Sequence, residues 1–228
     1  MVFGFGKKSR RVVEPDASGE PLRDTIVRPA FDWKARKRRT LRWLSVHPST
    51  YQQLVTAGFF VSYKTAQRNV SRWAKKKQTK CVGTVRGEDG RPTYMYGSWE
   101  PRSKQHDKYV TDFCIAYKDA EFERGNELEH YCDCVMKLNG ETFYVELDTG
   151  EMSLPQVRRR WRAYSECQGI VMVVSLSERR LGNVLNASEL LDGFSVFTTL
   201  TEAINDPYGL IWLDRNLSKI GVEKPDGF

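Results

Sequence analysis

Residues 62–97, SYKTAQRNVSRWAKKKQTKCVGTVRGEDGRPTYMYG, contain a helical hydrophobic repeat followed by two short runs typical of β-strands. Ser62 is a favourable N-cap for a helix that we expect to end near Lys77. The positions that recur at helical spacing, and should therefore face the core, are Ala66, Val70, Trp73 and Lys77. The opposite face carries side chains that can contact bases and phosphates, namely Lys64, Gln67, Arg68, Ser71, Arg72 and Lys75.

The segments on either side place this helix in a larger pattern. We expect two helices before it, over residues 35–46 and 49–57, and two strands after it, over residues 80–86 and 91–97. The strands are joined by a turn-rich tip, Gly87–Gly90. Three helices followed by a hairpin predict a winged helix-turn-helix domain over residues 33–100.

Charge is distributed unevenly along the chain. Residues 1–100 contain 21 Lys and Arg against 8 Asp and Glu, whereas residues 101–228 contain 15 against 21. No acidic residue occurs from Trp33 to Gly87. The basic side chains of that stretch should therefore present a positive field, for which a polyanion is the natural partner.

A basic winged helix predicts binding to double-stranded DNA. In helix-turn-helix folds the second helix of the motif enters the major groove, where Arg pairs with guanine and Gln with adenine. In this chain that helix is the one that begins at Ser62. Arg86 and Arg91 flank the wing tip and would reach a phosphate or the minor groove. The alternative is a winged helix that serves as a protein-interaction module.

Residues 1–32 mix Gly, Pro, Ser and charges with little periodicity, which predicts a flexible N-terminal arm. The five cysteines are odd in number, which favours reduced, buried thiols in a cytoplasmic protein; a metal role for Cys132 and Cys134 is the alternative. No apolar run reaches the roughly 18 residues of a spanning helix. We therefore expect a soluble protein with no membrane partner.

Residues 101–228 predict a second domain with a mixed sheet flanked by helices, so the chain as a whole is α+β or α/β. Asn139-Gly140 is a two-residue hairpin signal, and the apolar run 170–175 suits a buried central strand. We expect helices over residues 105–117 and 154–167, hairpin strands over 131–138 and 141–147, and edge strands over 193–198 and 210–213.

Three carboxylates gather on that hairpin. A turn at Asn139-Gly140 places Asp133 directly opposite Glu146, with Cβ atoms within about 5.5 Å. Asp148 follows on the same face as Glu146. Acids this close repel one another unless a cation lies between them, so the three could hold Mg²⁺ or Mn²⁺.

Other ionisable residues leave two interpretations open. Arg158, Arg159, Arg160 and Arg162 would contact DNA phosphate or pair with acids of their own domain. His106 and His130 are isolated in the sequence, which is typical of surface or hydrogen-bonded histidines. A further group of acids, which we expect in a charged loop, comprises Glu121, Glu123, Glu127 and Glu129.

The run CDCVMKLNGETFYVELDTG, residues 132–150, resembles the Asp…Glu-x-Lys core of the PD-(D/E)XK nuclease superfamily. With the preceding HDKYVTDFCIAY, residues 106–117, the layout resembles the replication-relaxation family of bacterial plasmids and mobile elements. The resemblance implies a restriction-endonuclease-like domain in which Asp133 and Glu146 bind metal. Asp148 stands where nucleases have Lys, and Cys132 stands where they have Pro, so the site departs from a working nuclease.

Three functions follow from these patterns. The leading hypothesis is a plasmid or mobile-element protein that docks on duplex DNA by its winged helix. Its degenerate nuclease-like domain would then serve assembly, as a homodimer or with replication or mobilisation proteins, or a second DNA contact. The alternative is a metal-dependent DNA endonuclease or nickase that uses Asp133, Glu146 and Asp148 as catalytic residues. A weaker alternative is a protein-interaction adaptor.

Overall fold

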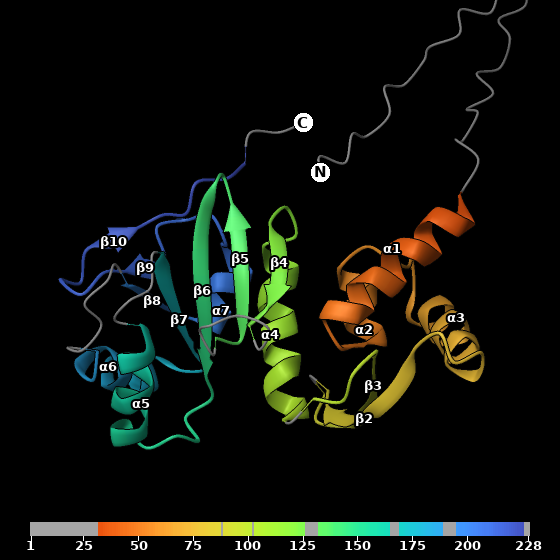
Figure 1. Ribbon diagram of the computed structural model, residues 1–228, viewed down its shortest axis with the longest axis horizontal. Coiled ribbons are helices and arrows are strands. Elements are labelled where there is room, and N and C mark those ends of the chain that lie inside the picture. The colour runs from red at the N-terminus through yellow and green to blue at the C-terminus, as the bar shows by residue number, and fades with distance from the viewer. Residues whose placement is uncertain are drawn as a thin grey trace, which may run out of the picture.

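The computed structural model describes residues 32–87, 89–101, 103–125, 132–164, 169–188 and 195–225. Apart from Asp32, the predicted N-terminal arm lies outside these residues, as do Glu88, Glu127, Glu129, His130 and Cys167. The described residues form helices and two separate sheets, so the structure is of the mixed α and β class predicted from the sequence (Figure 1).

The first unit packs three helices on a small antiparallel sheet. Its helices are α1 (Trp33–Val46), α2 (Tyr51–Thr56) and α3 (Tyr63–Lys75). Its strands β1 (Ser49–Thr50), β2 (Lys80–Arg86) and β3 (Pro92–Gly97) have the order β1-β3-β2. The core is formed by side chains of all three helices and of β3, among them Leu44, Leu54, Val70, Trp73 and Tyr96.

Two expectations for this unit are confirmed and two are wrong. Ser62 caps α3, because its Oγ accepts a hydrogen bond from the backbone N–H of Thr65, and Trp73 is buried. Lys77 does not belong to the core stripe: α3 ends at Lys75, and Lys77 is exposed with a positive φ of 56°. Ser49 lies in β1, since its backbone pairs with Tyr96 of β3 before α2 begins.

The second unit is built on a seven-stranded mixed sheet of order β10-β9-β8-β7-β6-β5-β4. Strands β6, β7 and β8 are parallel, and every other pairing is antiparallel. The strands are β4 (Glu121–Arg124), β5 (Cys134–Leu138), β6 (Glu141–Asp148), β7 (Ile170–Ser175), β8 (Ser195–Thr199), β9 (Trp212–Leu213) and β10 (Lys219–Ile220).

Helices cover both faces of this sheet (Figure 1). Phe113 of α4 (Lys104–Ala116) and Ala203 of α7 (Leu200–Asn205) share one buried cluster with β5, β6 and β7. Val157 and Trp161 of α5 (Leu154–Trp161), with Leu181 and Val184 of α6 (Glu178–Asn186), belong to the cluster on the other face. A 3₁₀ turn, Arg162–Tyr164, continues α5.

The hairpin register follows from its turn. Asn139 and Gly140 both have positive φ, 52° and 85°, as a two-residue type I′ turn requires. Cys134 therefore pairs with Val145, which is the register expected from the sequence. The run 170–175 forms the central strand β7, as expected, and parallel neighbours on both sides account for its apolar composition.

Several expectations for the second unit are corrected. The strand expected from residue 131 begins at Cys134, so Asp133 precedes it. The strand expected at an edge over 193–198 is the inner strand β8, whose five residues are all buried. Glu121 and Glu123 lie in strand β4 rather than in a loop. Besides β1, four elements were not predicted from the sequence: β4, β10, α6 and α7.

Helix α4 joins the two units, because it lies between the first unit and the large sheet (Figure 1). The Gln53 side-chain amide of α2 donates to the Lys108 carbonyl at 2.9 Å and to the Asp112 carboxylate at 2.7 Å. Thr111 Oγ1 donates to the Pro48 carbonyl at 3.0 Å, and the Arg86 N–H of the hairpin donates to Gln105 Oε1 at 2.9 Å. These contacts tie α2, β2 and the segment before β1 to one helix.

Candidate functional site

The structure presents two separate sites: a basic surface on the first unit and a buried carboxylate cluster in the second. The basic surface is centred on α3, whose 13 residues follow Ser62 directly. Buried Ala66, Val70 and Trp73 set the rotation of the helix and turn its opposite face to solvent. Lys64, Gln67, Arg68 and Lys75 are exposed there and make no side-chain hydrogen bond or ion pair with another described residue.

Two of the six residues predicted for this face are already engaged. Ser71 is half-buried, and its hydroxyl lies 2.9 Å from the Tyr51 hydroxyl. The Arg72 guanidinium donates to Asn69 Oδ1 at 2.9 Å and lies over the Trp33 ring at 5.5 Å. Arg72 is still exposed, but the stacking restricts its reach.

The two arginines expected at a wing tip lie on the β2–β3 hairpin that follows α3. Arg86 and Arg91 are both exposed. The Arg91 guanidinium is 3.8 Å from the Asp89 carboxylate, in an ion pair whose side chains are 85% and 63% exposed, so water screens it. Arg91 also lines a groove of about 940 Å³, and Tyr63, the first residue of α3, lines the same groove. The groove therefore connects the wing with the start of α3.

A further basic stripe on α1 was not identified from the sequence. Lys34, Arg38 and Arg42 are exposed and recur every four residues, so they lie along one side of the helix. The start of α1 contacts the end of α3, because the Trp33 and Trp73 rings are 5.9 Å apart. The signal that would have found this stripe is the four-residue spacing of cations within the acid-free segment.

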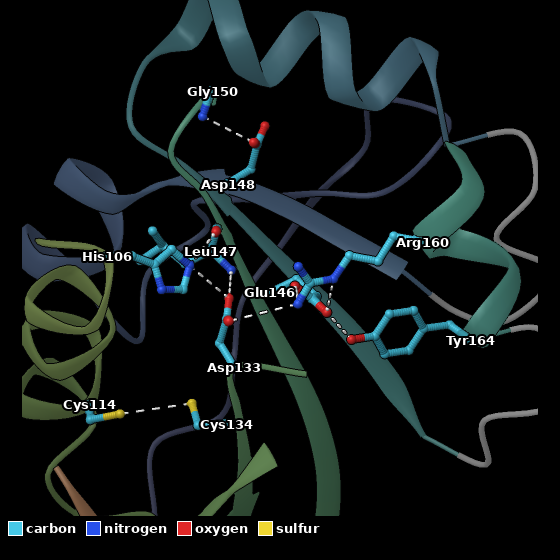
Figure 2. A network of polar contacts seen from close by, with 10 residues as sticks. All are labelled: His106, Cys114, Asp133, Cys134, Glu146, Leu147, Asp148, Gly150, Arg160 and Tyr164. Atoms are coloured by element: carbon cyan, nitrogen blue, oxygen red, sulfur yellow. Dashed lines mark hydrogen bonds and ion pairs between the residues drawn. The ribbon is translucent and has the colours of Figure 1, made fainter. Parts of the chain in front are cut away.

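The carboxylate cluster lies where β5 begins and β6 continues past it. Asp133 lies one residue before β5, and its backbone N–H donates to the Val145 carbonyl at 3.0 Å. Its Oδ2 accepts the Leu147 N–H at 2.7 Å, and His106 Nε2 lies 3.0 Å from the Leu147 carbonyl (Figure 2). These side chains thus satisfy the backbone of Leu147, which has no partner on strand β5.

His106 of α4, which is isolated in the sequence, is hydrogen-bonded in the structure, and this is one of the two environments expected for it. Its Nε2 is 3.3 Å from Asp133 Oδ2, and the ring is half-buried. Burial lowers the pKa of His106, but the hydrogen bond and negative charge of Asp133 outweigh it and raise the pKa to about 9. A pocket of about 160 Å³ adjoins both residues. His106 can therefore exchange protons with solvent while it holds Asp133.

This pairing predicts a pH-dependent stability. The folded pKa of about 9 exceeds the ordinary value of 6.5, so the folded protein binds the extra proton between these values. The stabilisation is complete below about pH 6.5 and is lost as the pH rises through about 9. We expect wild type to be more stable than His106→Gln by roughly 2 kcal/mol at pH 6, and the difference to shrink by pH 9.5. Urea unfolding of both proteins across this range measures the difference, and a pH-independent difference would contradict the assignment.

Glu146 lies on the face of β6 that α5 covers, and it is 3% exposed. The Arg160 guanidinium binds both carboxylate oxygens, with Nη2 2.7 Å from Oε2 and Nε 2.9 Å from Oε1. The Tyr164 hydroxyl also donates to Oε1. Burial and the charge of Asp133 raise the pKa of Glu146 to about 8, against the opposing effects of Arg160 and Tyr164.

Asp148, the third predicted carboxylate, has a different cation. Arg180 of α6 binds it through two nitrogens, with Nε 2.5 Å from Oδ2 and Nη2 3.1 Å from Oδ1. The same Nη2 donates to the Met152 carbonyl at 2.6 Å, and the Gly150 N–H donates to Asp148 Oδ1 at 3.1 Å. The hairpin thus brings Asp133 and Glu146 to one arginine and places Asp148 on another.

These contacts determine how well the site suits a metal. Within the described ranges, no group of three or more His, Cys, Asp and Glu is arranged to hold a metal ion. The oxygens of Glu146 and Asp148 already accept bidentate hydrogen bonds from arginines. A divalent ion would have to displace a guanidinium, so the residues as they lie do not fit the Mg²⁺ or Mn²⁺ that the family resemblance implies.

The other residues singled out in the sequence, the α5 arginines and two cysteines, also differ in their contacts. Of the arginines on α5, Arg160 pairs with acids of its own unit, whereas Arg158 and Arg159 are exposed. Cys132 and Cys134 do not share a face, because Cys132 packs with α5 and α6 and Cys134 lies 3.8 Å from Cys114 of α4. For Arg160, pairing with acids of its own domain was the alternative expected from the sequence, whereas Tyr164 and Arg180 were not identified as cluster residues. The spacing of Arg160 and Tyr164, four apart on a helix after β6, is the signal available for two of these three residues.

No helix in the described part of the chain is long and apolar enough to cross a bilayer. Comparisons with protein-family models, with curated proteins and with solved structures found no match to this chain. The proposals below therefore depend on the geometry of the two sites.

Proposed function

We propose that the protein binds double-stranded DNA through the exposed face of α3, as a winged helix-turn-helix protein of a plasmid or mobile element. The observation that carries the proposal is the set of four outward side chains, Lys64, Gln67, Arg68 and Lys75, that have no partner among the described residues. Three of them are cationic, and none of the four contributes to the core. They are therefore available to a polyanion.

The arrangement of α3 supports docking in the major groove. Helix α3 is the second helix of the α2–α3 pair, and the first residues of such a helix contact base edges. Gln67 and Arg68 lie in its first half, where an amide can pair with adenine and a guanidinium with guanine. Lys64 and Lys75 lie near its two ends and suit phosphates on either side of the groove.

Two neighbouring surfaces extend the proposed contact. Arg86 and Arg91 lie on the β2–β3 wing and would approach the DNA backbone beside the major groove. Arg91 and the first residue of α3 line one groove of the protein surface, so the wing and α3 lie close together. The α1 stripe begins beside the end of α3 and carries no acidic residue. A duplex lying along α3 would thus meet cations on three elements.

The second unit would provide assembly or a second DNA contact. Its carboxylates are held by its own arginines, which disfavours a metal-dependent nuclease as the function of this chain. The exposed Arg158 and Arg159 of α5 are suited to contact phosphate. We propose a replication-relaxation type of protein in which the nuclease-like domain no longer cleaves.

The test of the proposal is binding of a fluorescent duplex, measured by anisotropy at several salt concentrations. We expect log K to fall linearly with log[salt], because neutralised phosphates release counterions. An affinity that does not change between low and moderate salt would contradict an interface made of these cations. Incubation with supercoiled plasmid and Mn²⁺ should yield a shifted but uncut band, whereas nicking that Glu146→Gln abolishes would make the protein a nuclease.

The α1 stripe makes a separate prediction. Arg38→Ala with Arg42→Ala should reduce the slope of log K against log[salt] by about 1 to 2, because each phosphate contact contributes about 0.9. The loss of affinity should be the same for unrelated duplex sequences, since phosphate contacts carry no sequence information. Lys219→Ala with Lys224→Ala, which removes two exposed charges from the second unit, is the matched control and should leave the slope unchanged. Equal slopes for all three proteins would exclude α1 from the interface.

A further inference from the structure

The carboxylate cluster contains its own cations. Asp133 and Glu146 share Arg160, whose Nη2 is 2.7 Å from Glu146 Oε2 and 3.8 Å from Asp133 Oδ1 (Figure 2). His106 approaches Asp133 from the side opposite Arg160 (Figure 2). The guanidinium therefore lies between the two acids, where paired carboxylates otherwise hold a metal ion.

The oxygens of the pair are nearly saturated. Both oxygens of Glu146 accept from Arg160, and Oε1 also accepts from Tyr164. Asp133 Oδ2 accepts the Leu147 N–H and faces His106. Of the four oxygens, only Asp133 Oδ1 has no donor closer than 3.8 Å among the described residues, and its contact at that distance is again Arg160. Mg²⁺ and Mn²⁺ need about six oxygen ligands, several of them water. The carboxylate oxygens packed in this way are not available as such ligands.

The position of Arg160 is set by the fold. On α5 and the turn that follows, Val157, Trp161 and Tyr164 are buried against the sheet. Arg160 lies four residues before Tyr164, so both side chains project from the same side of the helix toward Glu146. The Glu146 side chain is 4% exposed and the Arg160 side chain is 31% exposed. The guanidinium is thus held against buried Glu146 while the Arg160 side chain stays partly exposed.

We propose that Arg160 is the resident cation of this site, and that the Asp133–Glu146 pair takes up a divalent ion only when the guanidinium is removed. This inference concerns the second unit and is independent of DNA binding by α3. A guanidinium balances one of the two negative charges without water, keeps its own charge at every physiological pH and fixes β6 to α5 in one geometry. It gives the cluster a structural role and leaves it without an ion that could activate water.

Calorimetric titration of Mn²⁺ into the metal-free full-length protein tests the proposal. Wild type should show no site at millimolar Mn²⁺. Arg160→Ala should bind one Mn²⁺ per chain at least tenfold more tightly, and Mn²⁺ should restore part of its lost thermal stability. Arg160→Ala with Glu146→Gln should lose the site, because one of its two carboxylates is then neutral.

Arg180→Ala is the matched control, because it removes the other buried arginine of the hairpin and leaves Arg160 in place. It should bind no Mn²⁺ at the Asp133–Glu146 pair. A wild-type Mn²⁺ site that Glu146→Gln abolishes would overturn the proposal, as would a folded Arg160→Ala protein that binds no ion. If Arg160→Ala does not fold with or without Mn²⁺, Arg160→Gln replaces it, because glutamine keeps much of the side-chain length. The Mn²⁺ affinity of Arg160→Gln is then compared with that of wild type.

Discussion

Replacing Lys64, Arg68 and Lys75 together with alanine is expected to weaken binding of duplex DNA by about 100- to 1,000-fold at moderate salt. Each of these side chains is exposed on α3 and has no partner in the described chain. A contact from Arg to a base costs about 1–3 kcal/mol when removed, and each phosphate contact lowers the salt slope by about 0.9. Anisotropy titrations of wild type and variant at three salt concentrations measure both quantities.

A control variant with the same change in net charge distinguishes a local interface on α3 from a general electrostatic attraction between the protein and DNA. Arg179→Ala, Lys219→Ala and Lys224→Ala remove three exposed cations from the second unit. This variant should lose much less affinity than the α3 variant, because screened charges contribute little beyond about 10 Å. Equal losses in both triple variants would mean that α3 is not the binding helix. Folding is controlled by circular dichroism, since none of the six side chains is buried.

Arg160→Met is expected to lower the free energy of unfolding by about 3 kcal/mol. The change keeps most of the side-chain volume but leaves Glu146, which is 3% exposed, without its bidentate partner. Breaking one side of a buried ion pair costs about 3–5 kcal/mol, and the 31% exposure of Arg160 places the expected loss at the low end. Urea unfolding at constant pH measures it.

Arg158→Met is the control on the same helix. Arg158 is exposed two residues earlier, so its replacement should change the free energy of unfolding by less than about 0.5 kcal/mol. Arg160→Met with Glu146→Leu should recover part of the loss, because an apolar pair no longer buries an unpaired charge. Equal stability of Arg158→Met and Arg160→Met would contradict the role given to the Arg160–Glu146 pair.

Where the local pattern is strong, the sequence predicted the structure well. The third helix, its Ser62 cap and its polar face follow from a repeat of three and four residues, which any amphipathic helix displays. The hairpin register follows from Asn139-Gly140, because two residues of positive φ leave one way to pair the strands. Both features depend on neighbours in the chain.

Errors concentrate where an element depends on distant partners. β8 was expected at an edge and lies inside the sheet, because its neighbours β7 and β9 come from other parts of the chain. Strand β4 was not predicted because its four residues include two glutamates, a composition typical of a loop. They form a strand because they pair with β5. Lys77 satisfied the helical spacing, but the helix had already ended at Lys75.

The sequence by itself determined the basic face of α3 and the register of the hairpin that carries Glu146, since both follow from helical or strand periodicity and one tight turn. Only the tertiary structure decided what balances the carboxylates of that hairpin. Arg160 and Arg180 reach them because α5 and α6 connect parallel strands and must pack on the same face of the sheet. Ion pairs between side chains 14 and 32 positions apart leave no periodic signal, so they appear only when the sheet is assembled.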